Sequence, residues 1–292
     1  MPTIASFSQS CFSVFNLDDT DWPVLVTVPH AGRDYPEELM ENLRIDPSQL
    51  ILFEDRRAEL LAQECIARGI AVVVARRPRA WLDLNRGAAE IDADIVEDLE
   101  WKDLPHVSNK VRGGLGLIPR RLGAINNVWR RPWPRAALDA RIADYHQPYH
   151  DAVSAMLARI RQQHGGALLM DLHSMPPLRP AFGRPAPRLV IGDLFGRSAQ
   201  GRMTQAVMSA AQQGGLTAAL NHPYAGGYTV QAHHDLSANI HAIQLEVDRS
   251  LYLCPDLLEA GEGVAAMARH VAELAMAAAA ELTRPFWPLA AE

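Results

Sequence analysis

Two histidines of this chain follow apolar, strand-like runs, and each stands beside residues that favour a turn. His30 follows WPVLVTV and precedes Ala-Gly, and His173 lies in ALLMDLHSMPP ahead of two prolines. Asp171 stands two residues before His173, so the alternation of an extended chain puts both side chains on one side. Imidazole is the commonest metal ligand, and a nearby carboxylate often orients it. The pattern indicates a metal site or, alternatively, two capping or hydrogen-bonding histidines.

Further polar side chains stand at the ends of other strand-like runs. RPRAWLDLNR supplies Asp83, Asn85 and Arg86, and AIQLEVDR supplies Glu246 and Arg249. Ligands of open α/β sheets bind outside the carboxyl ends of the strands, so we expect these side chains to share one rim. Imidazoles, carboxylates and a guanidinium are what a mononuclear metal hydrolase needs. Glu246 could instead be an ion-pair partner of Arg249.

The remaining histidines are weaker candidates. His146 and His150 in YHQPYH have the spacing of a helical metal pair, but the Glu of HExxH is absent, which favours a structural or rim role. His233 and His234 are predicted to be a solvated loop pair. NHPYAGGY is interpreted as a glycine loop, because no Lys follows it as in a phosphate-binding loop.

Alternating strand and helix patterns must position these residues. Apolar, β-branched runs predict strands over residues 22–32, 70–86, 167–173, 188–196 and 242–249. Helical patterns occupy residues 49–69, 137–166, 198–215 and 259–282, the second with a kink near Pro148. This alternation predicts one α/β domain over residues 1–292, with a mostly parallel or mixed central sheet and helices on both faces. Residues 87–135, rich in Gly, Pro, Arg and Trp, are predicted to form loops around the active-site mouth.

Composition narrows the class of protein. The 292 residues are 48% hydrophobic and 21% charged, as in an ordinary globular enzyme. A net charge of −6 and the lack of a Lys/Arg run argue against a nucleic-acid partner. Three scattered cysteines argue against a cysteine zinc site or a disulfide framework. Without a signal peptide or an apolar stretch of about 18 residues, the expectation is a cytoplasmic protein with no membrane partner. The oligomeric state stays open.

Eight motifs, taken together and in order, resemble the N-formylglutamate amidohydrolase family. They are VPHAGRDYP, FEDRRAEL, LDLNR, GLGLIPR, YHQPYHDAV, DLHSMP, NHPYAGGYT and IQLEVDRSLY. The resemblance runs from about residue 22 to residue 255, most of the chain. It implies a fold similar to that of the zinc carboxypeptidases and aspartoacylase, and the DLNR stretch is shared in kind with aspartoacylase.

The resemblance implies one Zn²⁺ per chain, with His30 and His173 as ligands. The third ligand should be a carboxylate. Carboxypeptidases use HxxE, but the third residue after His30 is Arg33, so this spacing fails. The matching acid is expected in FEDRR, with Asp55 as the choice and Glu54 as the alternative.

The resemblance also implies roles in catalysis and substrate binding. Glu246 matches a carboxypeptidase-type general base, and Arg79 is expected to stabilise the oxyanion. Asn85 and Arg86 match a substrate-binding pair, since a guanidinium can bind a carboxylate through two hydrogen bonds. Tyr228, in the glycine loop, is expected to close over the substrate.

The activity that follows is zinc-dependent hydrolysis of N-formyl-L-glutamate to formate and L-glutamate, as a step of histidine degradation. The partner is then a small acidic N-acyl amino acid. Two alternatives stay open. One is the same chemistry on another small N-acyl amino acid, because the pocket decides the acyl group. The other is a metal-binding or ligand-binding relative without catalysis.

Overall fold

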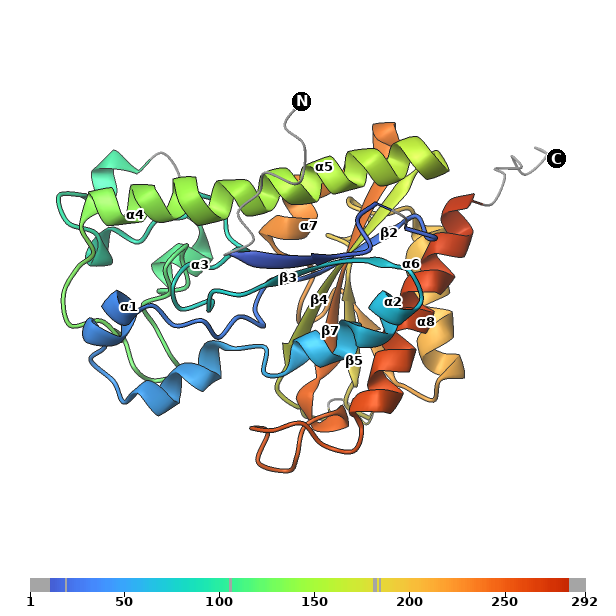
Figure 1. The fold of residues 1–292 in the computed structure, drawn as a ribbon. Helices are drawn as coiled ribbons and strands as arrows, with labels where there is room; N and C mark the ends of the chain where they lie inside the picture. The colour runs from blue at the N-terminus through green and yellow to red at the C-terminus, as the bar shows by residue number, and fades with distance from the viewer. Residues whose placement is uncertain (1–10, 19, 105–106, 181–182, 184, 284–292) are drawn as a thin grey trace.

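A mixed β-sheet organises the chain. The structure is a computed structural model that describes residues 11–18, 20–104, 107–180, 183 and 185–283. Within these residues, seven strands form one sheet in the order β1-β3-β2-β4-β7-β5-β6 (Figure 1). The strands are β1 (Phe12–Phe15), β2 (Val24–Val28), β3 (Ala71–Ala75), β4 (Ala167–Met175), β5 (Leu189–Gly192), β6 (Ala218–Leu220) and β7 (Ile240–Asp248).

The centre of the sheet is parallel and contains a switch in strand order. Strands β3, β2, β4 and β7 run parallel, whereas β1 and β5 run antiparallel to their neighbours β3 and β7. From β2 the chain passes to β3 on one side, and it then returns to β4 on the other side of β2. The carboxyl ends of β2 and β4 therefore flank a crevice of the kind in which α/β proteins bind ligands.

Helices cover both faces of the sheet. The α-helices are α1 (Glu37–Glu41), α2 (Gln63–Ala67), α3 (Asn109–Arg112), α4 (Arg135–Arg141), α5 (Gln147–His164), α6 (Gly201–Gln213), α7 (Tyr228–His233) and α8 (Val264–Thr283). The helices α4, α5 and α7 lie on one face, and α2, α6 and α8 lie on the other (Figure 1). The prediction of an α/β fold with a mixed sheet and helices on both faces is confirmed.

Alternation along β4 shows how the two faces are filled. Leu168 and Met170 pack in the apolar cluster that includes residues of α6 and α8. Leu169 packs in the other cluster, with residues of α5 and α7. Asp171 and His173 continue the face of Leu169, because successive side chains of a strand alternate. Polar residues of the site therefore lie at the edge of the core beneath α5 and α7.

The predicted helix over residues 49–69 is wrong. That segment is divided into two 3₁₀ helices, Pro47–Phe53 and Ala58–Ala62, followed by the short α2. Glu54 leaves the first helix in an extended conformation, and Arg57 has a positive φ of 57°. The periodic apolar residues belong to separate short turns, because the intervening residues 54–57 enter the site.

The long helix predicted over residues 137–166 is present, with a change of helix type in place of a kink. A π-helical turn, Ile142–His146, joins α4 to α5 and ends two residues before Pro148. Proline has no N–H to donate and disfavours a regular turn before it, which is the physical reason for the irregularity. The short elements β1, β6 and α7 were not predicted, because their sequences show no periodic pattern. The described residues of 87–135 form mostly loops and short turns, as expected.

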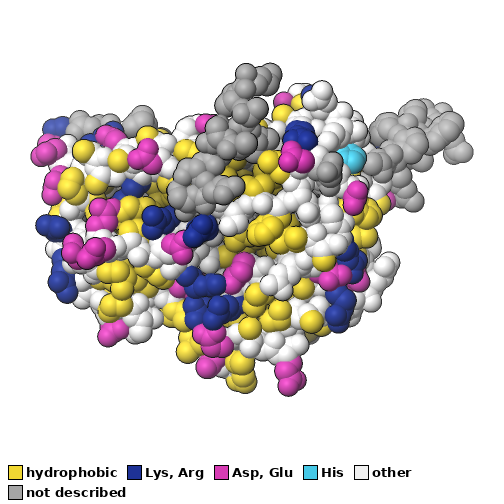
Figure 2. All heavy atoms as spheres, in the orientation of Figure 1, with side chains coloured by type: hydrophobic (Ala, Val, Ile, Leu, Met, Phe, Trp, Pro, Cys, Tyr) yellow, Lys and Arg dark blue, Asp and Glu magenta, His cyan; other side chains and the backbone are white. Residues whose placement is uncertain are grey.

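The surface in Figure 2 carries charges of both signs. Lys and Arg side chains alternate with Asp and Glu over this face instead of forming one basic stripe. In the described part of the chain, no helix combines the length and the apolar character needed to cross a membrane.

His241, at the opposite end of β7 from Glu246, gives a prediction about acid stability. Its Nε2–H donates to Asn239 Oδ1 (3.0 Å), its Nδ1 accepts from Gln200 N–H (3.4 Å), and burial lowers its pKa to about 4. In the unfolded chain His241 takes up a proton near pH ~6.5, whereas in the folded chain it stays neutral down to a pH of about 4. The folded state is therefore at full stability above pH ~6.5 and loses stability as the pH falls below it. The measurement is the free energy of unfolding in urea at pH 7 and at pH 5. We expect the decrease between these two pH values to be about 2 kcal/mol smaller in His241→Gln than in the parent. The exposed His222 supplies the control, since His222→Gln should lose as much as the parent. Equal losses in His241→Gln and the parent would contradict the prediction.

Candidate active site

A pocket lies at the carboxyl ends of the parallel strands. Its volume is about 540 Å³, and it is lined by His30 from the turn after β2, by the last residues of β4 and by residues of β7. Its lining includes the polar residues His30, Asp55, Arg79, Asn85, Arg86, Lys110, His173, Ser174, Tyr224, Gln244, Glu246 and Arg249, together with Leu115 and Gly227. Most of the side chains that the sequence assigns to catalysis and binding thus share one cavity.

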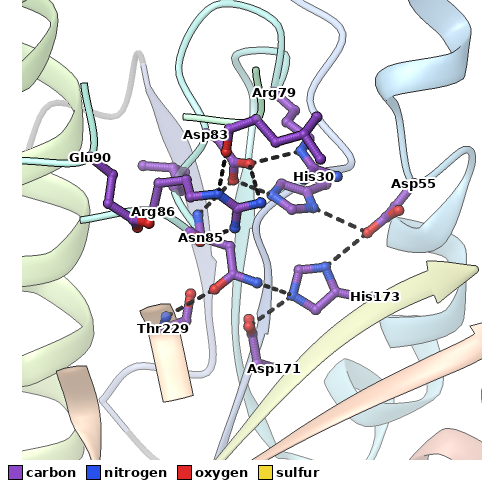
Figure 3. A network of polar contacts seen from close by, with 12 residues as sticks. His30, Asp55, Arg79, Asp83, Asn85, Arg86, Glu90, Asp171, His173 and Thr229 are labelled. Carbon is purple, nitrogen blue, oxygen red and sulfur yellow. Dashed lines mark hydrogen bonds and ion pairs between the residues drawn. The ribbon is translucent and has the colours of Figure 1, made fainter. Parts of the chain in front are cut away.

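Three of these residues converge on one point. The Nδ1 atoms of His30 and His173 lie 3.4 Å and 3.0 Å from Asp55 Oδ2. His30, Asp55 and His173 are exposed by only 2%, 4% and 3%, and one ligand atom of each lies within 4.8 Å of the other two. Figure 3 shows the two imidazoles facing the carboxylate from adjacent strand ends.

Each imidazole has a second carboxylate on its far side. His30 Nε2 lies 2.7 Å from Asp83 Oδ1, and His173 Nε2 lies 2.8 Å from Asp171 Oδ2 (Figure 3). Each imidazole thus lies between two carboxylates, with Nε2 near Asp83 or Asp171 and Nδ1 facing Asp55. Histidines that bind metals commonly donate their other ring N–H to a carboxylate in this manner. The structure therefore places Asp171 beside His173, where the strand alternation predicted it.

The cluster fits a divalent metal ion. His30 Nδ1 is buried without a hydrogen-bond partner among the described residues, although it points at a carboxylate. Burial alone would raise the pKa of Asp55, but the contacts with His173 and His30 outweigh burial and lower it well below its usual value. Two imidazole nitrogens and one ionised carboxylate would form a donor set that zinc accepts, and all three residues line the pocket.

Asp55 and its neighbour Glu54 are separated by the fold. Glu54 is also buried, at 3% exposure, but it accepts hydrogen bonds from Tyr35 Oη and from Arg56 Nη1 (2.9 Å). The Asp55 backbone N–H donates to His30 O (3.0 Å), which holds Asp55 against the loop after β2. The structure brings Asp55, and not Glu54, to the two histidines.

Glu246 lies beside His173 on the neighbouring strand. The two residues are directly paired in the β4–β7 register, and Gln244 Nε2 donates to Glu246 Oε1 (2.8 Å). Burial raises the pKa of the Glu246 carboxyl. Arg249, the alternative ion-pair partner that the sequence offered, instead contacts Asp55 Oδ1 (3.2 Å) and donates to the carbonyl of Glu54 (2.6 Å). Glu246 thus keeps an oxygen directed at the pocket.

The DLNR segment supplies the side chains opposite the sheet. Arg79 Nε donates to Asp83 Oδ2 (2.9 Å). Asn85 Nδ2 lies 3.2 Å from His173 Nε2, and its Oδ1 accepts from Thr229 N–H (3.0 Å). Arg86 donates from Nε to the Leu115 carbonyl (2.7 Å) and from Nη1 to the Asn85 carbonyl (2.6 Å). Arg86 Nη2 lies 3.8 Å from Asp83 Oδ2, so each nitrogen of this guanidinium faces a protein acceptor while the side chain lines the pocket.

Tyr228 is not among the residues that line the pocket. Its ring packs against His146 and His150, with centroids 5.9 Å and 5.1 Å apart, and Tyr224 from the same glycine loop lines the pocket instead. A Cβ on Gly227 would lie 2.2 Å from Asn85 Oδ1, so glycine is required for the loop to pack on the binding segment.

Sequence reasoning assigned no role in the site to two of its cations. Arg249 was placed on the rim and offered as an alternative partner of Glu246, and it lines the pocket and contacts Asp55. Lys110, on α3, was not considered. It lies within the predicted mouth loops and is one of only two lysines in the chain, which was the available signal.

The prediction for His233 as a solvated residue is wrong. His233 is buried, and its Nε2 lies 2.8 Å from His150 Nδ1, with the rings stacked. It lies in α7, an element without a sequence signal, whose packing under α5 covers it. His234 is half-buried, and its Nδ1 lies 3.0 Å from the Val230 carbonyl.

Comparisons with known proteins identify the family of this chain. The family model described as N-formylglutamate amidohydrolase matches residues 22–253. An N-formylglutamate deformylase of Pseudomonas putida is 26% identical over 236 residues, covering 79% of this chain and 82% of the relative. The crystal structure of an N-formylglutamate amidohydrolase from Ralstonia eutropha JMP134 has a TM-score of 0.84 at 26% identity, covering 94% and 98% of the two chains. A gene product of Agrobacterium tumefaciens has the same fold, with a TM-score of 0.66 at 21% identity and coverage of 94% and 96%. The chain belongs to the N-formylglutamate amidohydrolase family, a family of amide-bond hydrolases.

Proposed function

We propose that this protein is a zinc-dependent amidohydrolase that converts N-formyl-L-glutamate into formate and L-glutamate. The observation that carries the proposal is the convergence of His30, Asp55 and His173 beside Glu246 in one pocket. The similar proteins from Pseudomonas putida and Ralstonia eutropha carry this activity in their names. Family membership alone leaves the acyl group open, so the pocket must supply the specificity.

His30, Asp55 and His173 would hold the metal through two imidazole nitrogens and a carboxylate oxygen. When bound, zinc supplies a Lewis acid that polarises the formyl carbonyl and increases the acidity of water. Asp83 and Asp171 hold the imidazoles in the orientation that presents Nδ1. Because these two contacts exist before any substrate arrives, the site is preorganised.

Glu246 would act as the general base. It accepts the proton of the attacking water and passes that proton to the nitrogen of the leaving amine. A buried carboxyl with a raised pKa suits both transfers, since its proton affinity lies closer to neutral pH. Arg79, fixed through Nε by Asp83, keeps terminal N–H groups for the oxyanion that develops on the formyl oxygen.

Cations in the pocket suit a substrate with two carboxylates. Asn85 and Arg86 would bind one carboxylate of the glutamyl moiety. Lys110 and Arg249 line the same pocket and add positive charge to it. We assign closure over the substrate to Tyr224 in place of Tyr228.

A substrate panel tests the proposal directly. The zinc-loaded protein is offered N-formyl, N-acetyl, N-formimino and N-carbamoyl derivatives of glutamate, and release of the free amine is measured. N-formyl-L-glutamate should give the highest kcat/KM, and chelation should abolish turnover until zinc is restored. Preference for another derivative would support the same chemistry on a different acyl group. Metal binding without turnover of any derivative would favour a non-catalytic relative.

Lys110 gives a prediction about substrate charge. Its side chain is exposed, and its ammonium group has no hydrogen-bond or ion-pair partner in the described part of the chain. We expect Lys110→Gln to raise KM for N-formylglutamate by about 10-fold, which is the worth of one partly exposed charge-assisted hydrogen bond. KM for N-formylnorvaline, which lacks the second carboxylate, should change less than about 2-fold.

The second lysine of the chain is the matched control. Lys102 is exposed and pairs with Glu100 outside the pocket, so Lys102→Gln should keep the parent KM for both substrates. Equal changes in KM for the two substrates in Lys110→Gln would assign Lys110 a role other than recognition of the second carboxylate.

A further inference from the structure

Two buried histidines of the helical segment hold the loop that carries the binding residues. His146 Nε2 lies 2.8 Å from the carbonyl oxygen of Arg86, and His150 Nε2 lies 3.0 Å from the carbonyl oxygen of Leu84. The histidines are exposed by only 2% and 7%. The two carbonyls stand on either side of Asn85.

Among the described residues, the backbone supplies no hydrogen-bond donor to either carbonyl. Residues 83–86 lie outside any helix or strand, and no backbone N–H of the described residues donates to Leu84 O or Arg86 O. A buried carbonyl without a donor is costly, so the imidazole N–H groups fix where this loop can lie. The π-helical turn sets the position of His146 one residue before α5 begins.

A chain of hydrogen bonds fixes the proton on His150. Ser154 Oγ lies 3.2 Å from His233 Nδ1, and His233 Nε2 lies 2.8 Å from His150 Nδ1. If the hydroxyl donates to His233 and His233 donates to His150, the proton of His150 is left on Nε2, where Leu84 O accepts it. This arrangement needs neutral rings, and burial lowers the pKa of His150 and of His233, the latter to about 4.

We propose that His146 and His150 are positioning residues that place Asn85 and Arg86 for substrate binding. The proposal rests on the proposed function of the site. It also explains the helical spacing of YHQPYH without a metal, because each Nε2 donates to a separate carbonyl. The side chains of Asn85 and Arg86 reach the pocket from a backbone that is held at both carbonyls.

The test compares three variants of His146, whose side chain makes one hydrogen bond among the described residues, to the Arg86 carbonyl, while its Nδ1 has no partner there. Glutamine reaches about as far as Nε2 and can donate to the carbonyl. Leucine cannot donate, and asparagine is too short to reach. We expect His146→Leu and His146→Asn to lower kcat/KM for N-formylglutamate by about 10- to 100-fold, mainly through KM, since small misplacements have effects of this size. His146→Gln should stay within about 3-fold of the parent, and zinc content should be unchanged in all three.

His164 supplies the matched control on the same helix. Its Nε2 lies 3.3 Å from the carbonyl of Thr20, away from the binding loop, so His164→Leu should keep the parent kcat and KM. Parent kinetics in folded His146→Leu would overturn the proposal, and so would equal losses in the Gln and Asn variants. If the leucine variant does not fold, the Gln and Asn pair decides.

A crystal structure of His146→Asn gives a readout that needs no activity. The Arg86 carbonyl should turn away from its parent position, and the Asn85 side chain should move with it. An unmoved loop would overturn the positioning role. A parent enzyme without turnover on the substrate panel would instead contradict the proposed function, and the displaced loop would still be seen.

Discussion

Replacement of Glu246 by glutamine is expected to lower kcat by about 10²- to 10⁴-fold, the usual contribution of a positioned acid or base. Glutamine keeps the size and shape of the side chain and its contact with Gln244, but it cannot accept the proton of the attacking water. Zinc content and substrate binding should be retained. Single-turnover kinetics and metal analysis of the same preparation measure these quantities.

The matched control for this variant is Glu54→Gln. Glu54 is a buried carboxylate near the site that pairs with Tyr35 and Arg56 and does not line the pocket. Its variant should keep kcat within about 3-fold of the parent, as expected for an interaction outside the pocket. Turnover near the parent rate in Glu246→Gln, with zinc intact, would end the mechanism proposed for this residue.

Replacement of Asp55 by asparagine is expected to weaken zinc binding by well over the ~10- to 100-fold that the loss of an outer hydrogen-bond partner costs a metal site. The asparagine side chain removes the negative charge that faces both imidazoles at 3.4 Å and 3.0 Å. A site with three protein ligands has none to spare, so His30→Ala and His173→Ala should act likewise. Competition with a chromophoric chelator measures the affinity, and turnover should fall in parallel.

Glu54→Gln again separates the alternatives, because Glu54 was the other acid that the sequence offered as a ligand. It should keep the zinc affinity of the parent, since the side chain faces Arg56 and not the histidines. Full zinc binding in Asp55→Asn, together with loss in Glu54→Gln, would show that the third ligand had been assigned to the wrong acid.

Local patterns allowed much of the sheet and several polar residues of the pocket to be predicted, whereas Asp55 and Arg79 came from the family resemblance. The strand-like runs that contain β2, β4 and β7 are apolar, and their ends carry His30, His173 and Glu246, so the polar set could be recognised along the chain. The prediction of one helix over residues 49–69 was wrong because apolar spacing over a short stretch fits both one helix and several short turns. The prediction that His233 is solvated was wrong because the exposure of a residue depends on which elements pack over it. Two adjacent histidines in a sequence do not indicate which elements those are.

The sequence by itself determined which side chains could do chemistry and on which side of their strands they lie. Side-chain alternation and polarity are local properties, so Asp171 and His173 could be placed together from two residues of spacing. The tertiary structure alone decided which distant residues meet. The strand order brings β2 beside β4, which places His30 against a residue 143 positions away, and the break after Phe53 turns Asp55 inward while Glu54 faces Arg56. Which distant residues come into contact depends on the packing of the whole sheet and on which buried charges are paired. A local sequence pattern cannot predict these contacts.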